Sequence, residues 1–358
     1  MKYYRINITI NIIILGLCSC QSRQQATKSI STLDSTLQVK STSILGNKLS
    51  EINAQSGQVI IMEVQTGQIK ALVGLTKKDS ANYQPCENFA LSQESGLMHP
   101  ISLLAALESG KVKLSDKVDT GNGIYSVYGR LLKDHNWNRG GYGELTVQEG
   151  LAVSSNIATY KTMEKAFGDN PQSYFDLLAK MDYGKPDSII GIANLKPAYF
   201  VTPKDSNWTK TAFAWFSIGY NQLISPIQML TFYNAIANNG KLIQPQLYKD
   251  SVVVINPQIA SKASIDSLKQ ALAFNITDGL GQPAKSDKVA VAGMQGTTSL
   301  STSENSTMDM YAVQFCGYFP VDNPKYSIIV SINKIGLPAS GGLMAGDVFR
   351  KIVDYMSN

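Results

Sequence analysis

The sequence predicts an α+β domain: a mostly antiparallel β-sheet flanked by helices, with an all-helical subregion. Three observations predict this class. Helical apolar patterns open and close the domain. Strand-type runs gather near both ends of the chain and are joined by short turns, as in antiparallel sheets. The middle of the chain is dominated by helix-type segments.

The first helix is predicted over residues 36–53, where apolar residues recur at helical spacing and Asp34 precedes them as an N-cap. Residues 57–74 follow with two β-rich runs on either side of Gln65-Thr66-Gly67-Gln68. This pattern predicts a hairpin in which Gly67 supplies a positive φ.

A second helix is predicted over residues 100–108 and ends at Gly110. Residues 118–145 are rich in Gly, Asn and Tyr, which is typical of loops and short strands. Thr146 and Glu149 then have the spacing of a capping box and mark a new helix start. Further helices are predicted over residues 157–167, 171–181 and 226–238, the last with Pro226 in its first turn.

Strands return near the C-terminus. They are predicted over residues 289–294, 310–319 and 326–333, with a turn at Asp322-Asn323-Pro324 between the last two. A closing helix is predicted over residues 344–356. The aromatic run at 213–220 is interpreted as core.

Composition narrows the class further. The chain has 358 residues, of which 44% are hydrophobic, so it can bury a substantial core. No linker divides residues 31–358, which are expected to form one domain. The net charge of +5 and the lack of dense basic stretches argue against nucleic-acid binding. Two histidines and no Cys-x-x-Cys motif give no support to a metal site.

The N-terminus predicts export. Lys2 and Arg5 precede an apolar run from Ile6 to Leu17, which is too short to span a bilayer and fits a secretory signal. The run ends in Leu-Cys-Ser-Cys, which resembles a bacterial lipobox. Residues 1–19 are thus interpreted as a lipoprotein signal peptide, Cys20 as the lipidated residue, and residues 20–30 as a polar tether. An ordinary cleaved signal peptide is the alternative.

The mature chain keeps Cys86 and Cys316. A disulfide between them is compatible with export, and two free thiols are equally compatible with the sequence.

Three segments carry the residues on which a catalytic interpretation depends. Residues 94–110 read ESGLMHPISLLAALESG and lead into an apolar helix. Ser154-Ser155-Asn156 precedes the helix predicted over 157–167, a position typical of a simple N-cap. Residues 291–300 read VAGMQGTTSL and have strand character.

Together these segments resemble the three motifs of the penicillin-binding protein transpeptidase domain, a member of the serine DD-peptidase and β-lactamase-like superfamily. In that family the first motif reads Glu-Pro-Gly-Ser-x-x-Lys-Pro and the third reads Lys-Thr-Gly. Further matches extend the resemblance over residues 31–358. It implies the fold of that domain on an exported lipoprotein anchored in the cell envelope and facing the periplasm.

The resemblance also implies that the catalytic groups are lost. Aligned without a gap, Gly96 stands at the nucleophilic Ser and His99 at the Lys of the first motif; in the other alignment the Ser is deleted. Met294 replaces the Lys of the third motif, whereas Gly296 and Thr297 remain.

We therefore expect a catalytically inactive protein with a binding or regulatory role in peptidoglycan and cell-wall biogenesis. Ser154, Asn156, Gly296 and Thr297 are expected to form a groove that takes a peptidoglycan stem peptide, or a segment of a cell-wall synthesis protein, by strand pairing. No cofactor is expected. His99 is expected to be structural, with its ring hydrogen-bonded to the backbone.

Two alternatives stay open. One is an active serine DD-transpeptidase or carboxypeptidase in which His99 activates Ser95, since residues four apart share a helix face. The other is a purely structural envelope lipoprotein whose groove is blocked.

Overall fold

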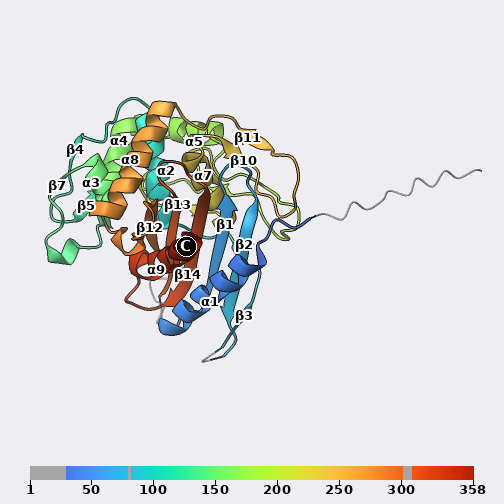
Figure 1. The fold of residues 1–358 in the computed structure, drawn as a ribbon. Coiled ribbons are helices and arrows are strands. Elements are labelled where there is room, and N and C mark those ends of the chain that lie inside the picture. Colours follow the sequence, from blue (N-terminus) through green and yellow to red (C-terminus); the bar gives the residue numbers. More distant parts are fainter. Residues whose placement is uncertain (1–29, 80–81, 301–308) are drawn as a thin grey trace, which may run out of the picture.

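The computed structural model describes residues 30–79, 82–300 and 309–358. Its central element is an antiparallel sheet with strand order β12-β13-β14-β1-β2-β3 (Figure 1). The strands are β1 (Ser56–Glu63), β2 (Ile69–Lys77), β3 (Tyr83–Pro85), β12 (Ala292–Ser299), β13 (Met310–Phe319) and β14 (Tyr326–Ile335). The predicted α+β class and antiparallel sheet are confirmed.

Helices cover both faces of this sheet. On one face lie α1 (Ser35–Glu51) and α9 (Asp347–Met356). The other face packs against a helical layer: α2 (His99–Glu108), α3 (Val147–Ala152), α4 (Asn156–Phe167), α5 (Pro171–Lys180), α6 (Ala212–Ser217), α7 (Pro226–Ala237) and α8 (Lys262–Asp278). None of the helices in the described ranges is long and apolar enough to cross a membrane.

Burial on both faces explains the uninterrupted apolar run Val59–Met62 in β1. Successive strand residues point to opposite faces. Val59 and Ile61 join the core beneath α1 and α9, whereas Ile60 and Met62 join the core beneath the helical layer. Each face of the strand therefore requires large apolar side chains.

Short strand pairs surround the helical layer. They are β4 (Lys117–Asp119) with β7 (Glu144–Thr146), β5 (Ile124–Val127) with β6 (Arg130–Lys133), β8 (Tyr199–Phe200) with β9 (Gln222–Leu223), and β10 (Leu242–Ile243) with β11 (Val254–Asn256). The first two pairs occupy the segment predicted to contain loops and short strands.

Several helix and strand boundaries lie where the local capping and turn signals predicted them. The Asp34 carboxylate accepts a hydrogen bond from the backbone N–H of Leu37 at the start of α1. Thr146 and Glu149 form the expected capping box of α3. Gly67 has a φ of 73° in the turn between β1 and β2.

Other boundaries differ from the prediction. The strand expected at 289–294 is β12, which runs from Ala292 to Ser299 and so includes the whole third motif. The last helix begins at Asp347 rather than 344, because a wide π-helical turn, Gly341–Gly346, packs against the sheet first. Helix α8 was not predicted, although Ile265, Leu268 and Leu272 lie buried at helical spacing.

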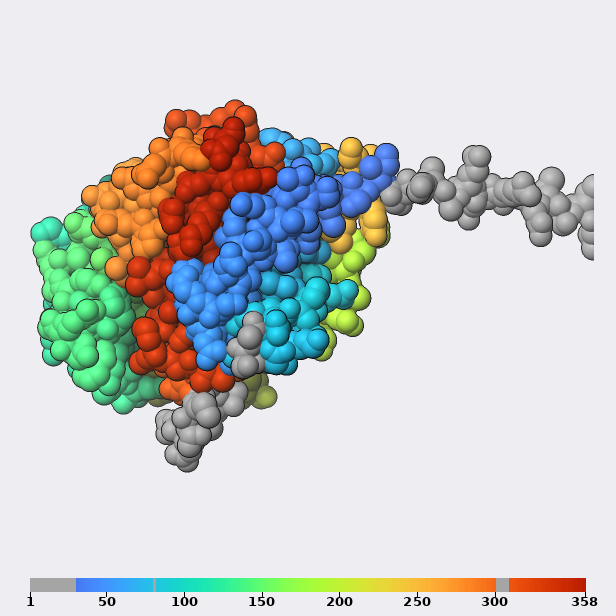
Figure 2. Space-filling model, turned by 60° about the horizontal axis from the view of Figure 1, so that its bottom comes forward, coloured from blue at the N-terminus to red at the C-terminus, as the bar shows by residue number. Residues whose placement is uncertain are grey.

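The first and last helices lie against each other across one face of the domain, as Figure 2 shows for the blue and red segments. A nearly buried ion pair joins them: Lys48 Nζ lies 2.8 Å from Asp347 Oδ2. Arg350 and Lys351 also contact Asp347. Although burial opposes ionisation, hydrogen bonds from these three cations lower the pKa of Asp347 to about 2.

Candidate functional site

A cleft of about 810 Å³ lies at the outer edge of β12, where the sheet ends. Its lining contains Gly96, His99, His135, Ser154, Asn156, Ile218, Tyr220, Gly279, Leu280, Gln282, Pro283, Gln295, Gly296, Thr297, Thr298, Ala339, Ser340, Gly341, Gly342 and Leu343. Among these described residues there is no Lys, Arg, Asp or Glu. The cleft is therefore of mixed polar and apolar character and nearly free of formal charge.

The floor of the cleft is a direct contact between two backbone segments. A Cβ placed on Gly296 would lie 2.9 Å from the backbone carbon of Gly96 and from the backbone nitrogen of Leu97. A Cβ on Gly96 would lie 3.1 Å from Thr297 N and from Thr298 Oγ1. The short 3₁₀ turn Gly96–Met98 thus presses against β12 with no room for a side chain on Gly296 and little on Gly96.

Ser95 points away from this cleft. Its hydroxyl donates a hydrogen bond to Gln314 Oε1 at 2.8 Å, and its side chain is buried. Gln314 in turn donates to the hydroxyl of Ser331 at 3.2 Å. Ser95 also caps the 3₁₀ turn, with its hydroxyl oxygen accepting from Leu97 N. The serine is thus held in a neutral network on the sheet.

His99 begins α2 and lines the cleft, but it is only 3% exposed. Its Nδ1 lies 3.0 Å from the hydroxyl of Thr159 on α4. The predicted hydrogen bond to the backbone is thus replaced by one to a side chain. Burial lowers the pKa of the imidazole to about 4, because the charged ring would lack hydration at this buried position. At neutral pH the position therefore carries no cation.

Ser154, Ser155 and Asn156 form the turn before α4. Ser154 has a left-handed φ of 51° and lines the cleft together with Asn156. Ser155 is the N-cap, and its hydroxyl donates to the buried carboxylate of Asp134 at 2.8 Å. Asp134 also accepts from the backbone N–H of Ile157. This carboxylate anchors the turn to the chain just after β6.

Two buried polar groups in the cleft have no partner in the described structure: Gln295 Nε2 and Thr298 Oγ1. Gln295 is 5% exposed and Thr298 is 1% exposed. The Gln295 amide is oriented by Asn275, whose Nδ2 donates to Gln295 Oε1 at 2.9 Å. A buried N–H without a partner favours a ligand that brings an acceptor.

Thr297 contacts the wall of the cleft that the π-helical turn forms. Its hydroxyl oxygen accepts a hydrogen bond from Gly341 N at 3.0 Å, which fastens the π-helical turn to β12. Met294 is completely buried in the core beneath the helical layer and does not line the cleft.

The structure thus brings together six of the residues singled out from the sequence and leaves out two. Gly96, His99, Ser154, Asn156, Gly296 and Thr297 line one cleft. Ser95 and Met294 lie outside its lining. Sequence reasoning missed Asp134, Thr159 and Thr298, of which only Thr298 lies beside a motif and could have been found there. Gln295 was identified as the replacement for the Thr of the third motif, but no role was predicted for it.

Neither cysteine is cross-linked. Cys316 is a buried free thiol and Cys86 is a partly exposed one. In the described ranges, no three His, Cys, Asp or Glu residues gather in a way that could hold a metal ion. Cys20 and the rest of the predicted signal and tether up to residue 29 lie outside the described residues.

The chain matches one family model, described as the penicillin binding protein transpeptidase domain, over residues 57–354. It is 25% identical over 350 residues to the probable peptidoglycan D,D-transpeptidase PenA of Neisseria flavescens, covering 92% of this chain and 82% of that protein. It is also 25% identical over 339 residues to the probable peptidoglycan D,D-transpeptidase PbpC of Pseudomonas aeruginosa. That match covers 90% of this chain but only 57% of PbpC.

Solved structures show the same fold. The transpeptidase domain of Burkholderia pseudomallei penicillin-binding protein 3 superposes with a TM-score of 0.76 at 23% identity, covering 90% of this chain and 94% of that one. A protein described as a peptidoglycan glycosyltransferase from Burkholderia ambifaria gives a TM-score of 0.75, also at 23% identity, with 91% and 96% covered.

The contact between Gly96 and Gly296 makes a stability prediction. Gly296→Ala is expected to lower the free energy of unfolding by about 1–3 kcal/mol, because the added methyl group must displace backbone atoms. Gly46→Ala in α1 is the control. Its Cβ would meet nothing closer than Leu75 Cδ1 at 3.7 Å, so the variant is expected to gain about 0.5–1 kcal/mol from helix propensity. Denaturant unfolding of both variants measures the difference, and a neutral Gly296→Ala would contradict the packing described.

The buried imidazole makes a pH prediction. The pKa of His99 is about 4 in the folded protein and 6.5 in the unfolded chain. Between these values the unfolded chain binds more protons, so stability should fall as the pH drops from about 6.5 to 4, by up to about 3 kcal/mol. NMR titration should show one histidine charging near pH 4, and His99→Gln should remove that signal and flatten the pH dependence. His135→Gln identifies the second signal. A His99 signal that titrates near pH 6.5 is the contrary outcome.

Proposed function

The chain belongs to the penicillin-binding protein transpeptidase domain family, and we propose that it has lost acyl-transfer chemistry and keeps the cleft beside β12 as a peptide-binding site. Its role is then binding or regulation in peptidoglycan and cell-wall biogenesis. The observation that carries this proposal is the close contact of Gly96 with Gly296, at the place where the family's first and third motifs meet.

The missing nucleophile is the first argument for inactivity. Gly96 has no hydroxyl, and the Thr298 hydroxyl and the backbone of β12 crowd the space in which a serine side chain would start. The Ser95 hydroxyl donates its hydrogen bond to Gln314 on the sheet. Among the described residues, the partners of this hydroxyl are Gln314 and the backbone N–H of Leu97, and no hydrogen bond joins it to His99, which speaks against activation of Ser95 by His99.

The missing cations are the second argument. His99 is neutral at physiological pH, and Met294 is an apolar core residue. Loss of a serine nucleophile alone lowers turnover by about 10³–10⁶ in serine hydrolases. A cleft that also lacks the charges that would activate the nucleophile and hold a carboxylate cannot make up that loss.

Binding can survive these losses. Strand β12 is an edge strand of the sheet, and an extended peptide can pair with such an edge through main-chain groups alone. Gln295 Nε2 and Thr298 Oγ1 are buried without a hydrogen-bond partner in the described structure, and a small side-chain shift toward the cleft would let them donate to a peptide carbonyl. The relatives are named for peptidoglycan D,D-transpeptidases, so the proposed ligand is a peptidoglycan stem peptide or an extended segment of a cell-wall synthesis protein.

The open cleft also speaks against a purely structural role. That alternative predicts a groove filled by the protein's own side chains, whereas about 810 Å³ is open beside β12. We further propose export by the signal at residues 1–19 and attachment through lipidated Cys20, with residues 20–30 as the tether to the domain.

Covalent labelling tests the loss of chemistry. The purified protein is expected to show no fluorescent-penicillin band and no mass increase, because nothing in the cleft can be acylated. Gly96→Ser is expected to remain unlabelled, since no cation is restored beside it. The transpeptidase domain of Burkholderia pseudomallei penicillin-binding protein 3 is the positive control. A stable adduct that Ser95→Ala abolishes would establish the active alternative instead.

Peptide titration tests the binding site. A short acetylated D-alanyl peptide is expected to bind as its C-terminal amide at least as tightly as in its free-acid form, because no cation lines the cleft. Gln295→Leu should weaken binding by about five- to tenfold, the effect of one hydrogen bond. Gln270→Leu, at an exposed position of α8, is the control. Calorimetry in which the free acid binds tenfold tighter would contradict the proposed recognition.

A further inference from the structure

The β5–β6 hairpin lies next to the cleft and is not part of the main sheet. Asn156, which lines the cleft, donates its side-chain N–H to the carbonyl of Lys133 at 2.8 Å. His135, just beyond β6, lines the cleft as well. In Figure 1 the hairpin strand β5 lies on the side of the molecule opposite β10 and β11.

Three cations on and beside the hairpin rest on aromatic rings. The guanidinium of Arg130 lies 4.1 Å from the centroid of the Trp215 ring. Lys133 Nζ lies 4.2 Å from that of Trp137. Lys161 Nζ lies 4.5 Å from that of Tyr125. Such contacts attract a cation without neutralising its charge.

These cations are not paired with carboxylates. Within the described ranges, none of the three has an Asp or Glu oxygen within the 4.0 Å of an ion pair. Neighbouring lysines in the same part of the chain are paired: Lys117 with Glu144 and Lys165 with Asp116. The hairpin therefore keeps positive charge that its surroundings do not balance.

Exposed aromatic surface accompanies this charge. Trp137 is 43% exposed beside Lys133, and Tyr128 is 71% exposed at the tip of the hairpin. Each ring presents an apolar face to solvent that the apolar face of a ligand ring can cover. Tyr125, Tyr128, Arg130, Lys133, Trp137 and Lys161 are called the hairpin ridge below.

We propose that the hairpin ridge binds an acidic saccharide chain. The apolar face of a pyranose ring stacks on an aromatic ring, and the carboxylate of an acidic sugar pairs with a cation held beside that ring. Arg130 and Lys133 are three residues apart on β6, about 10 Å along the strand, and lie on alternate faces. A ligand that reaches both must be elongated and follow the edge of the hairpin.

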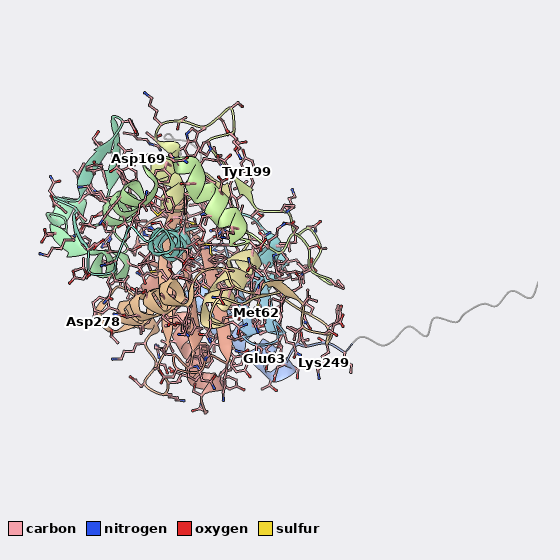
Figure 3. The ribbon with its side chains drawn as sticks, turned by 90° about the horizontal axis from the view of Figure 1, so that it is seen from above. Met62, Glu63, Asp169, Tyr199, Lys249 and Asp278 are labelled. Carbon is pink, nitrogen blue, oxygen red and sulfur yellow. The ribbon has the colours of Figure 1, made fainter. Side chains whose placement is uncertain are left out.

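The position of the ridge favours a saccharide over a membrane surface. The described chain starts at Ile30, whose carbonyl accepts a hydrogen bond from Lys249 N. Figure 3 shows Lys249 across the molecule from the green β4–β7 region. Under the anchoring proposed above, the tether joins the domain on the side opposite the ridge. Binding at the ridge does not depend on peptide binding in the cleft.

Saccharide titration of the full mature chain tests the ridge. Hyaluronan hexasaccharide supplies sugar rings with carboxylates, chitohexaose supplies rings without charge, and poly-γ-glutamate supplies charge without rings. The hexasaccharide of hyaluronan is expected to bind most tightly, to bind more tightly than its disaccharide, and to weaken as salt is raised. Trp137→Ala and Lys133→Gln should each weaken it by about three- to fivefold.

Controls separate this result from general charge effects and from the cleft. Lys249→Gln removes one positive charge on the opposite side and should leave binding unchanged, as should Gln295→Leu in the cleft. Thermal melting of Lys133→Gln and Arg130→Gln confirms that these conservative variants fold. The proposal fails if poly-γ-glutamate or anionic vesicles bind as tightly as the acidic saccharide, or if the ridge variants bind it as the unaltered protein does.

Discussion

The contact of Gly96 with the edge strand at Gly296 is the constraint on which the site depends. Because neither residue has a side chain, the turn that begins α2 can lie directly on β12. Gly219 supports the same turn from another side, where a Cβ would collide with the carbonyl of Ser95. Gly341 approaches β12 in the same way, at the carbonyl of Gly296. The cleft is thus shaped by backbone contacts that a catalytic side chain would disturb.

Uncharged groups pack around this turn. Ser95, Gln314 and Ser331 form a hydrogen-bonded chain of uncharged groups beneath the turn, and His99 is held uncharged by burial. A charged group near the site has a structural role, because the Asp134 carboxylate accepts hydrogen bonds that hold the start of α4. The cations of the hairpin lie outside the cleft lining. Under the proposed function, recognition inside the cleft would depend on amide and hydroxyl groups, and the charged groups of the hairpin would act outside it.

Much of the fold could be predicted because local signals and global packing agree. Caps at Asp34 and Thr146, the turn at Gly67 and the apolar run of β1 each specify their element within a few residues. The start of β12 was misplaced, because the edge of an apolar run does not reveal where strand pairing begins. The partner of His99 was missed because Thr159 lies sixty residues away in sequence, and only tertiary packing brings the two together. The exclusion of Ser95 from the cleft likewise depends on Gln314, a residue of a distant strand.

The pairing of β1 with β14 has a further consequence for how the protein is made. Neighbours at the centre of the sheet come from opposite ends of the chain, and α9 completes the layer begun by α1. A nascent chain therefore cannot close its sheet until the distant strand β14 has been synthesised, and β1 lacks this partner until then. For a chain proposed to leave the cytoplasm through a narrow translocation channel, such late closure of the sheet would favour transport before folding.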